Sequence, residues 1–418
     1  MKVCVFSLGC KVNQYEGQAI ADALRAAGAE TAQELVAADV YLFNTCSVTA
    51  EADKKSRQLI AKARRLNPSA PVYIIGCSSQ NDPAPYAERD SVVYISGTAG
   101  KKDIAARILS DHAAAPAVVD IRPLPSVYEE FAATGHSRTR AHIKIQDGCN
   151  NFCSYCIVPY LRGRSRSRSP EAVLAEARAA AAGTKEIVFT GIDLSSYGKD
   201  IGTDLVALIR DAGDINVRKR LGSLECGVIS EPLLEAMRDS GFCPHFHLSL
   251  QSGSDTVLRR MNRHYTAADY AKKVDLIRGF FPDAGITTDI ICGFPGETDI
   301  EHAASVAFTK AIGFSDIHVF PYSERAGTVA AAMPQPVDKR VRLARAAEMG
   351  EVKKALHAAF LRSMSGRVFP VYYEEVNDGL AHGYTGNYVK VYAAATPGEI
   401  ENTCLTTFYK DGIQGEIV

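Results

Sequence analysis

Cysteine is the residue type with the clearest potential for chemistry in this chain of 418 residues, which contains 11 of them. Three form a C-x3-C-x2-C pattern at Cys149, Cys153 and Cys156, among loop-forming Asn and Ser residues. Thiolates are soft ligands that suit iron–sulfur clusters or zinc, and a structural zinc site would normally have a fourth Cys or His. Three ligands on a 4Fe-4S cluster leave one iron open to another molecule. We therefore predict such a cluster here, with zinc as the alternative.

A second set of cysteines is spread over the first 80 residues. Cys10, Cys46 and Cys77 each come directly after an apolar β-like run, at intervals of 36 and 31 residues. These intervals match the length of a βαβ repeat, and loops that follow successive parallel strands meet at one edge of the sheet. We expect the three thiols to converge there, although a strand-end cysteine taken singly is more often a packing residue. Packing is what we expect for the remaining five, Cys4, Cys226, Cys243, Cys292 and Cys404.

The elements that must position the second set form the first predicted domain, residues 1–112. Strands are predicted at 2–8, 40–45, 72–76 and 92–96, and helices at 14–27 and 49–66, the latter with Thr49 as its N-cap. This alternation indicates a parallel sheet. Residues 113–140 lose periodicity and contain three prolines, so we expect a linker or an excursion along the edge of the sheet.

A longer series occupies the second predicted domain, residues 141–336. We expect six strands, at 141–146, 186–190, 218–224, 245–250, 285–291 and 317–320, alternating with helices at 170–182, 204–211, 231–239, 267–280 and 300–312. Six strands with five crossovers indicate an open parallel barrel with its chemistry at the strand C-termini. A basic connecting helix follows within 337–365, at about 338–363. The last part, 366–418, is predicted as a small all-β barrel with strands at 368–375, 388–393, 404–409 and 415–418.

Polar residues follow the predicted barrel strands where a cofactor would lie. The set comprises Gly191, Asp193, Glu225, Ser249, Gln251 and Gly293. Turns and helix caps are an adequate explanation for the Gly and Ser members. They explain Glu225 and Gln251 less well, because a charge or an amide pointed into a barrel mouth needs a polar partner.

Charge is balanced overall, with 47 Lys+Arg against 48 Asp+Glu and a net charge of −1, so attraction for nucleic acid would have to be local. Local basic runs do occur, at Arg162, Arg164, Arg166 and Arg168 and at the start of the connecting helix, Lys339 and Arg340. A solvated face is the plain alternative for the helix. Tyr384 and Tyr388 in the last part could stack on bases.

The amino-acid sequence around these motifs resembles that of a known family. Residues 146–153 (QDGCNNFC) and 160–168 (YLRGRSRSR) resemble the methylthiotransferase branch of the radical S-adenosylmethionine enzymes, and the likeness covers essentially the whole chain. Residues 7–16 (SLGCKVNQYE) look most like the branch members that methylthiolate N6-threonylcarbamoyladenosine beside the tRNA anticodon. The resemblance implies a flavodoxin-like N-terminal domain, a partial (β/α)6 radical S-adenosylmethionine barrel and a TRAM-like RNA-binding barrel.

The resemblance also implies the cofactors and their residues. Cys149, Cys153 and Cys156 would hold the radical 4Fe-4S cluster, and Cys10, Cys46 and Cys77 an auxiliary one. Two S-adenosylmethionine molecules would be used per turnover, as radical source and as methyl donor. Contacts to that cofactor would come from Phe152, Tyr155 and Ile157 on the adenine side, and from Gly191, Asp193, Glu225, Ser249, Gln251, Arg263 and Gly293 around the amino acid and ribose.

The implied reaction inserts sulfur and a methyl group at C2 of the modified adenosine-37. Its partners would be the tRNA anticodon stem-loop and an electron donor such as flavodoxin or ferredoxin. Relatives that act on isopentenyladenosine or on a ribosomal-protein aspartate remain alternatives, as does a noncatalytic iron–sulfur tRNA-binding protein. The start of the chain lacks a secretory signal, and no run approaches the roughly 18 apolar residues of a membrane span. We therefore expect a soluble, cytoplasmic protein with no membrane partner.

Overall fold

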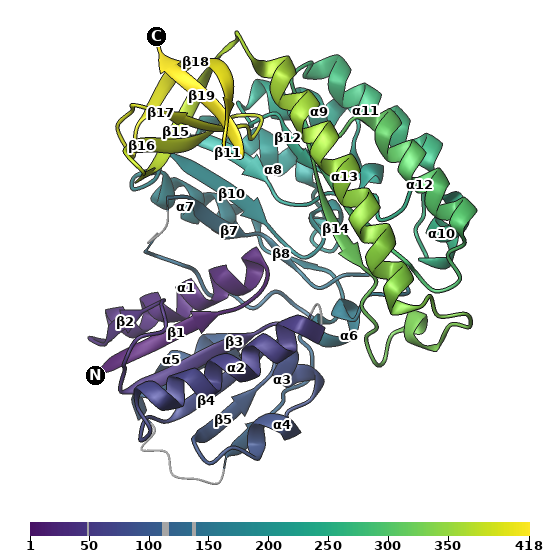
Figure 1. Ribbon diagram of the computed structural model, residues 1–418. Helices are drawn as coiled ribbons and strands as arrows, with labels where there is room; N and C mark the ends of the chain where they lie inside the picture. The colour runs from purple at the N-terminus through teal and green to yellow at the C-terminus, as the bar shows by residue number, and fades with distance from the viewer. Residues whose placement is uncertain (48–49, 111–116, 136–138) are drawn as a thin grey trace.

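The computed structural model describes residues 1–47, 50–110, 117–135 and 139–418 (Figure 1). It has three parts along the chain: an N-terminal α/β sheet, a partial barrel of parallel strands, and a closed β-barrel that a long helix connects to the rest. In the described residues no helix is long and apolar enough to cross a membrane.

The N-terminal sheet is parallel throughout, and its described strands lie in the order β2-β1-β3-β4-β5-β6. Without β6, this is the flavodoxin-like order 2-1-3-4-5. The strands are β1 (Lys2–Ser7), β2 (Glu30–Ala32), β3 (Val40–Thr45), β4 (Val72–Gly76), β5 (Val92–Ser96) and β6 (Val118–Asp120). The helices include α1 (Lys11–Ala26), α2 (Ala50–Leu66), α3 (Cys77–Asn81), α4 (Ala84–Ala87) and α5 (Ile104–Ser110).

Helices cover both faces of this sheet. Ile20 of α1 and Ile104 of α5 pack with Val5 on one face, and Ile60 of α2 packs with Phe43 on the other. Both faces of the strands are therefore buried, which explains why β3, β4 and β5 are continuous apolar runs. The N-cap predicted at Thr49 lies outside the described residues.

Of the two alternatives for 113–140, the described residues form the excursion along the sheet edge rather than a free linker. β6 pairs with β5 at the edge of the sheet, and Phe131 and Ala133 pack against Tyr15 of α1. A three-residue edge strand is too short to show an alternating pattern. The buried aromatic contact depends on a helix more than 100 residues earlier.

The partial barrel contains the six predicted strands in sequential order. They are β7 (Ala141–Lys144), β10 (Glu186–Thr190), β11 (Arg218–Leu221), β12 (His245–His247), β13 (Gly285–Cys292) and β14 (Asp316–Pro321). Two three-stranded parallel sheets meet through the bridges Lys219–Phe242 and Leu224–Leu248. Large apolar side chains such as Phe189, Phe246 and Ile286 join one core with the surrounding helices.

The helices around this barrel are α7 (Pro170–Ala181), α8 (Leu205–Asp211), α9 (Glu231–Asp239), α10 (Asp255–Arg260), α11 (Ala267–Phe280) and α12 (Asp299–Ile312). Two of these helices begin where a threonine side chain caps the first backbone N–H groups. Thr266 and Thr298 each form a capping box, with Asp269 and Glu301, which satisfies backbone N–H groups that a helix start leaves free. This explains why the sequence located these helices closely.

The C-terminal part packs against the partial barrel. Helix α13 (Lys339–Met364) runs alongside β14 (Figure 1) and leads into β15 (Val368–Asn377), β16 (Leu380–Thr385), β17 (Lys390–Ala393), β18 (Ile400–Tyr409) and β19 (Gly412–Ile417). These close in the order β15-β16-β17-β19-β18. Strand β16 was not predicted as such, because its Gly383 interrupts a short run; a Cβ there would lie 2.1 Å from the Tyr372 carbonyl oxygen.

Candidate active site

The loop that contains Cys149, Cys153 and Cys156 is fixed by Gln146 in the short strand β8 (Gln146–Asp147). The Gln146 side chain donates to the Gly148 carbonyl at 2.7 Å and accepts from the Asp193 backbone N–H at 2.7 Å. Gly148 has φ +71°, and a Cβ there would lie 1.9 Å from the Arg164 carbonyl oxygen. Only glycine fits this turn, so the backbone holds the three cysteines in one compact loop.

Several residues predicted to contact a cofactor surround this loop. Arg263 donates to the Cys153 sulfur at 3.2 Å and pairs with Glu225 at 2.8 Å. It also donates to the Ser249 carbonyl at 3.2 Å. Asp193 lies 3.8 Å from the Cys149 sulfur. The structure thus brings a carboxylate and a guanidinium from distant strands to the edge of the cysteine loop.

The other predicted cofactor residues lie near the loop in different settings. Phe152 makes an edge contact with Tyr160, and Gln251 has φ +70° while its backbone pairs with that of β13. The remaining four are Tyr155, packed near Phe294; Ile157, buried with Cys77; Gly191, beside the Gln146 side chain; and Gly293, whose N–H donates to Glu297.

The second cysteine set converges at the carboxyl edge of the N-terminal sheet. Cys10 precedes α1, Cys46 follows β3, and Cys77 begins α3 directly after β4. A Cβ at Gly9 would lie 2.5 Å from the Cys46 sulfur, so this thiol is against the turn that carries Cys10. Cys77 packs with Ile157, the residue directly after Cys156. One cysteine of the N-terminal set therefore packs directly beside the loop that carries Cys149, Cys153 and Cys156, at the junction of the two domains.

The donor chemistry fits metal clusters. All six cysteines are free thiols. Burial raises the pKa of Cys10 and of Cys149, and it raises that of Cys156 to about 11. Protein groups alone therefore leave these thiols protonated at neutral pH, whereas a bound iron ion stabilises the thiolate.

Three of the four arginines in the 162–168 run, all predicted to contact RNA, are buried instead. Arg162, Arg166 and Arg168 are 1%, 2% and 3% exposed. Arg166 pairs with Asp147 at 3.2 Å, and Arg168 pairs with Glu176. The prediction that these three bind phosphates is wrong for this structure, because their charges are already neutralised inside the protein. Arg164, which points away from the core, is exposed and lies 4.4 Å from the Phe152 ring centroid.

Arg162 is the centre of a buried charge network between the two domains. Its guanidinium donates to both carboxylate oxygens of Glu16 in α1, at 3.0 and 3.1 Å, and to Asp147 at 3.0 Å. Lys101 and Lys144 pair with the same Glu16. Burial would raise the pKa of Glu16, but Arg162, Lys101 and Lys144 outweigh it and hold that pKa well below its usual range. The network fixes the N-terminal domain on the barrel beside the cysteines.

The tyrosines predicted to stack on bases face the partial barrel. Tyr388 stacks on Tyr384 with ring centroids 4.7 Å apart and on His245 at 4.6 Å. The Arg140 and Arg220 guanidiniums lie within 5.4 Å of the Tyr388 ring. These contacts help to join the β-barrel to the partial barrel, but 39% of the Tyr388 surface stays exposed, so stacking on a base stays a prediction. Lys339 and Arg340, at the exposed start of α13, stay predicted phosphate contacts.

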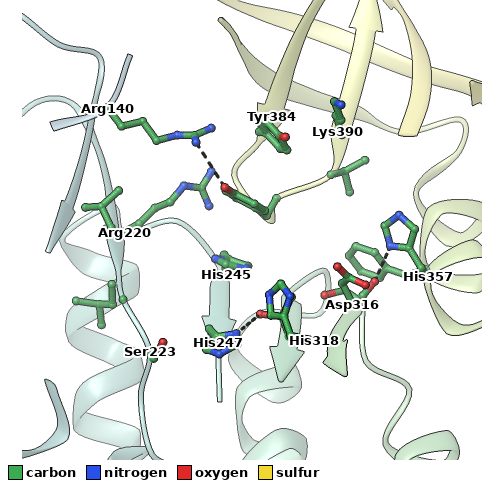
Figure 2. Close-up of a pocket in the computed structure, with 18 of the residues that line it drawn as sticks. Arg140, Arg220, Ser223, His245, His247, Asp316, His318, His357, Tyr384 and Lys390 are labelled. Atoms are coloured by element: carbon green, nitrogen blue, oxygen red, sulfur yellow. Dashed lines mark hydrogen bonds between the residues drawn. The ribbon is translucent and has the colours of Figure 1, made fainter. Parts of the chain in front are cut away.

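A cavity of about 670 Å³ that was not expected from the sequence opens at the partial barrel, and Lys11 of α1 and residues of the β-barrel also line it (Figure 2). Five of the chain's ten histidines line it: His142, His245, His247, His318 and His357. Four of them lie in β7, β12 and β14. Polar side chains on strands that should face an apolar interior, with His245 and His247 two residues apart on one face, were the signal that could have revealed it.

Comparison with known proteins identifies the class of enzyme to which this fold and cysteine loop belong. Residues 143–308 match the Radical SAM superfamily, and residues 2–97 match the group described as Uncharacterized protein family UPF0004. The radical S-adenosylmethionine methyltransferase TsrM from Kitasatospora setae has a similar fold, with a TM-score of 0.56 and 17% identity over 79% of this chain and 77% of that one. Fold and cysteine loop together define a radical S-adenosylmethionine enzyme.

Curated relatives narrow this class. The threonylcarbamoyladenosine tRNA methylthiotransferases MtaB of Bacillus subtilis and Thermotoga maritima are 37% and 36% identical, over 98% of this chain and 94% and 96% of theirs. A tRNA-2-methylthio-N(6)-dimethylallyladenosine synthase of Thermoanaerobacter is 33% identical over 98% of this chain and 91% of its own. The chain belongs to the radical S-adenosylmethionine methylthiotransferase family, whose cofactors are S-adenosylmethionine and two 4Fe-4S clusters.

Proposed function

We propose that this protein converts N6-threonylcarbamoyladenosine at position 37 of tRNA to its 2-methylthio derivative. The observation that supports this most directly is the apposition of the two cysteine sets, with Cys77 packed on the residue after Cys156. Such an arrangement places a radical-generating site next to a possible sulfur source. The relatives with the highest identities given above are named for this substrate.

When bound, the clusters and S-adenosylmethionine supply one-electron chemistry, sulfur and the methyl group, and the protein supplies placement and exclusion of water. Arg263 holds Glu225 beside the Cys153 sulfur, which orients a carboxylate toward the site of a bound amino-acid group. Asp193, near Cys149, is anchored by Gln146. The electron comes from a donor such as flavodoxin or ferredoxin. The enzyme binds the anticodon stem-loop of its tRNA substrate in the cytoplasm.

Deletion of the gene is expected to remove 2-methylthio-N6-threonylcarbamoyladenosine from cellular tRNA and leave the unmethylthiolated nucleoside in its place. The measurement is mass spectrometry of digested tRNA from the deletion strain, the parent, and the deletion strain complemented with the gene. If 2-methylthio-isopentenyladenosine disappears instead, the substrate is that of the dimethylallyladenosine synthases. If no tRNA nucleoside changes, the proposed function is wrong.

Replacing Arg164, Lys339 or Arg340 with Ala is expected to weaken binding of the anticodon stem-loop and to make it less salt-dependent. Each lost phosphate contact lowers the slope of log affinity against log salt by about one unit. Binding would be measured at several salt concentrations, with Arg178→Ala as a control at an exposed arginine on α7 that pairs with Asp214. Wild-type slopes in all three variants would show that these residues do not contact phosphates.

A further inference from the structure

The cavity at the partial barrel carries an excess of positive charge. Its lining includes five basic residues, Lys11, Arg140, Arg220, Lys353 and Lys390, against three acidic ones, Glu186, Asp316 and Asp411. Lys353 pairs with Asp316 at 3.3 Å, and Lys390 with Asp411 at 2.9 Å. The excess therefore lies elsewhere in the cavity, around Lys11.

The side of the cavity next to the N-terminal domain holds this excess. Arg140 and Arg220 share the Glu186 carboxylate, at 2.6 and 2.9 Å, and Arg140 also pairs with Glu374 of β15. Lys11 forms no ion pair with any of the described residues. The Nε2 atom of His245 is buried without a hydrogen-bond partner, again within the part of the chain that the structure describes. An anion in this corner would meet cations and an unused polar atom.

The positive charges around His245 act on its imidazole, as their positions in the cavity lead one to expect. Burial lowers the pKa of His245 well below its usual value, and Arg220, Lys11, His247 and Arg140 lower it further. Figure 2 shows Arg140 and Arg220 on one side of the cavity, with His245, His247 and His318 below them. The Asp289 carboxylate lies 3.2 Å from the Nε2 atom of His247. The histidines therefore line a corner in which a negative charge is stabilised.

The position of the cavity relates it to both cysteine sets. Lys11 directly follows Cys10, and Ser223, at the lower left of Figure 2, lies two residues before Glu225, the partner of Arg263. At its other end are Tyr384 and Lys390 of the β-barrel. A nucleoside that reacts between the two cysteine-bearing edges can therefore extend a substituent into this space, and about 670 Å³ is large enough for a modified base.

We propose that this cavity binds the carboxylate of the N6-threonylcarbamoyl group, with Lys11 and Arg140 as the residues that recognise it. The inference rests on the proposed function. Threonylcarbamoyl carries a carboxylate and a hydroxyl, whereas a dimethylallyl group is uncharged and gains nothing from ammonium and guanidinium groups. Lys11 is an exposed side chain at the cavity with no ion pair among the described residues, so it gains a partner from the acid and none from the dimethylallyl group. The cavity thereby makes the enzyme selective for the charged nucleoside.

The test measures binding of cluster-loaded enzyme to three anticodon stem-loops, which carry threonylcarbamoyladenosine, its methyl ester, or plain adenosine. Wild type should bind the acid about 10- to 100-fold more tightly than the ester, as for a hydrogen bond to a charged group. Lys11→Met should lose most of this preference and bind plain adenosine as wild type does. Lys354→Met, at an exposed residue of α13 outside the cavity, should keep it.

Since Lys11 adjoins Cys10, iron content is measured for every variant. Arg140→Gln, remote in sequence from the cysteines, should reduce the same preference and decides the question if Lys11→Met loses iron. Unchanged acid-to-ester ratios in both variants would overturn the inference. Equal weakening for all three RNAs would also overturn it, because the cations would then bind an RNA phosphate. Product formation by wild type on the acid stem-loop tests the proposed function separately.

Discussion

Alanine in place of Cys149, Cys153 and Cys156 is expected to abolish cleavage of S-adenosylmethionine by the reduced enzyme. We propose these three thiols as the ligands of the cluster that must bind this cofactor, and no other described cysteine lies in the same loop. Iron content should fall from about eight to about four per chain if each set holds one 4Fe-4S cluster, as proposed. The measurements are iron analysis after anaerobic reconstitution and chromatography of 5′-deoxyadenosine.

The complementary variant replaces Cys10, Cys46 and Cys77 with Ala. It should lose the other four irons and all methylthiolated product, while cleavage of S-adenosylmethionine stays measurable because Arg263, Glu225 and the radical loop are intact. Cys404→Ala controls for the loss of a thiol outside both sets. Product formation by the triple variant would refute the auxiliary cluster, and a stable zinc with no iron in wild type would refute both clusters.

Replacing Arg162 with Met is expected to lower the free energy of unfolding by about 3 kcal/mol, because the change leaves Glu16 and Asp147 with fewer partners in a buried site. Arg164→Met is the matched control two residues away, with an exposed side chain and an expected change within about 0.5 kcal/mol. Urea unfolding of the cluster-free protein measures both. Equal stabilities would mean that the Arg162 network does not hold the domains together.

The same network predicts a direction for pH dependence. The pKa of Glu16 is lower in the folded than in the unfolded protein, so its contribution to stability is present above the unfolded value of about 4.5. It is lost as pH falls below that value toward the folded pKa. Wild type should therefore lose more stability than Arg162→Met between pH 5 and 3, measured by urea unfolding at each pH.

Sequence patterns located most elements of the fold because short-range chemistry specifies them. The capping boxes at Thr266 and Thr298 and the apolar runs of β3, β4 and β5 can be recognised within a few residues. Among the elements that were missed, β2, β6 and β16 are short edge or barrel strands. Their pairing partners, rather than their own residues, stabilise them.

For the candidate site, the sequence by itself determined the two cysteine sets. Cysteines can be recognised as candidate ligands from their residue type and from their spacing within one loop or after successive strands. Only the tertiary structure decided what the arginines do. Arg162 and Arg164 look equivalent in a Gly- and Ser-rich run, yet Glu16, 146 residues before Arg162, makes one of them a buried ion-pair partner. The cavity was likewise undetermined by the sequence, since its lining comes from all three parts of the chain and the net charge in it depends on which carboxylates fold against which cations.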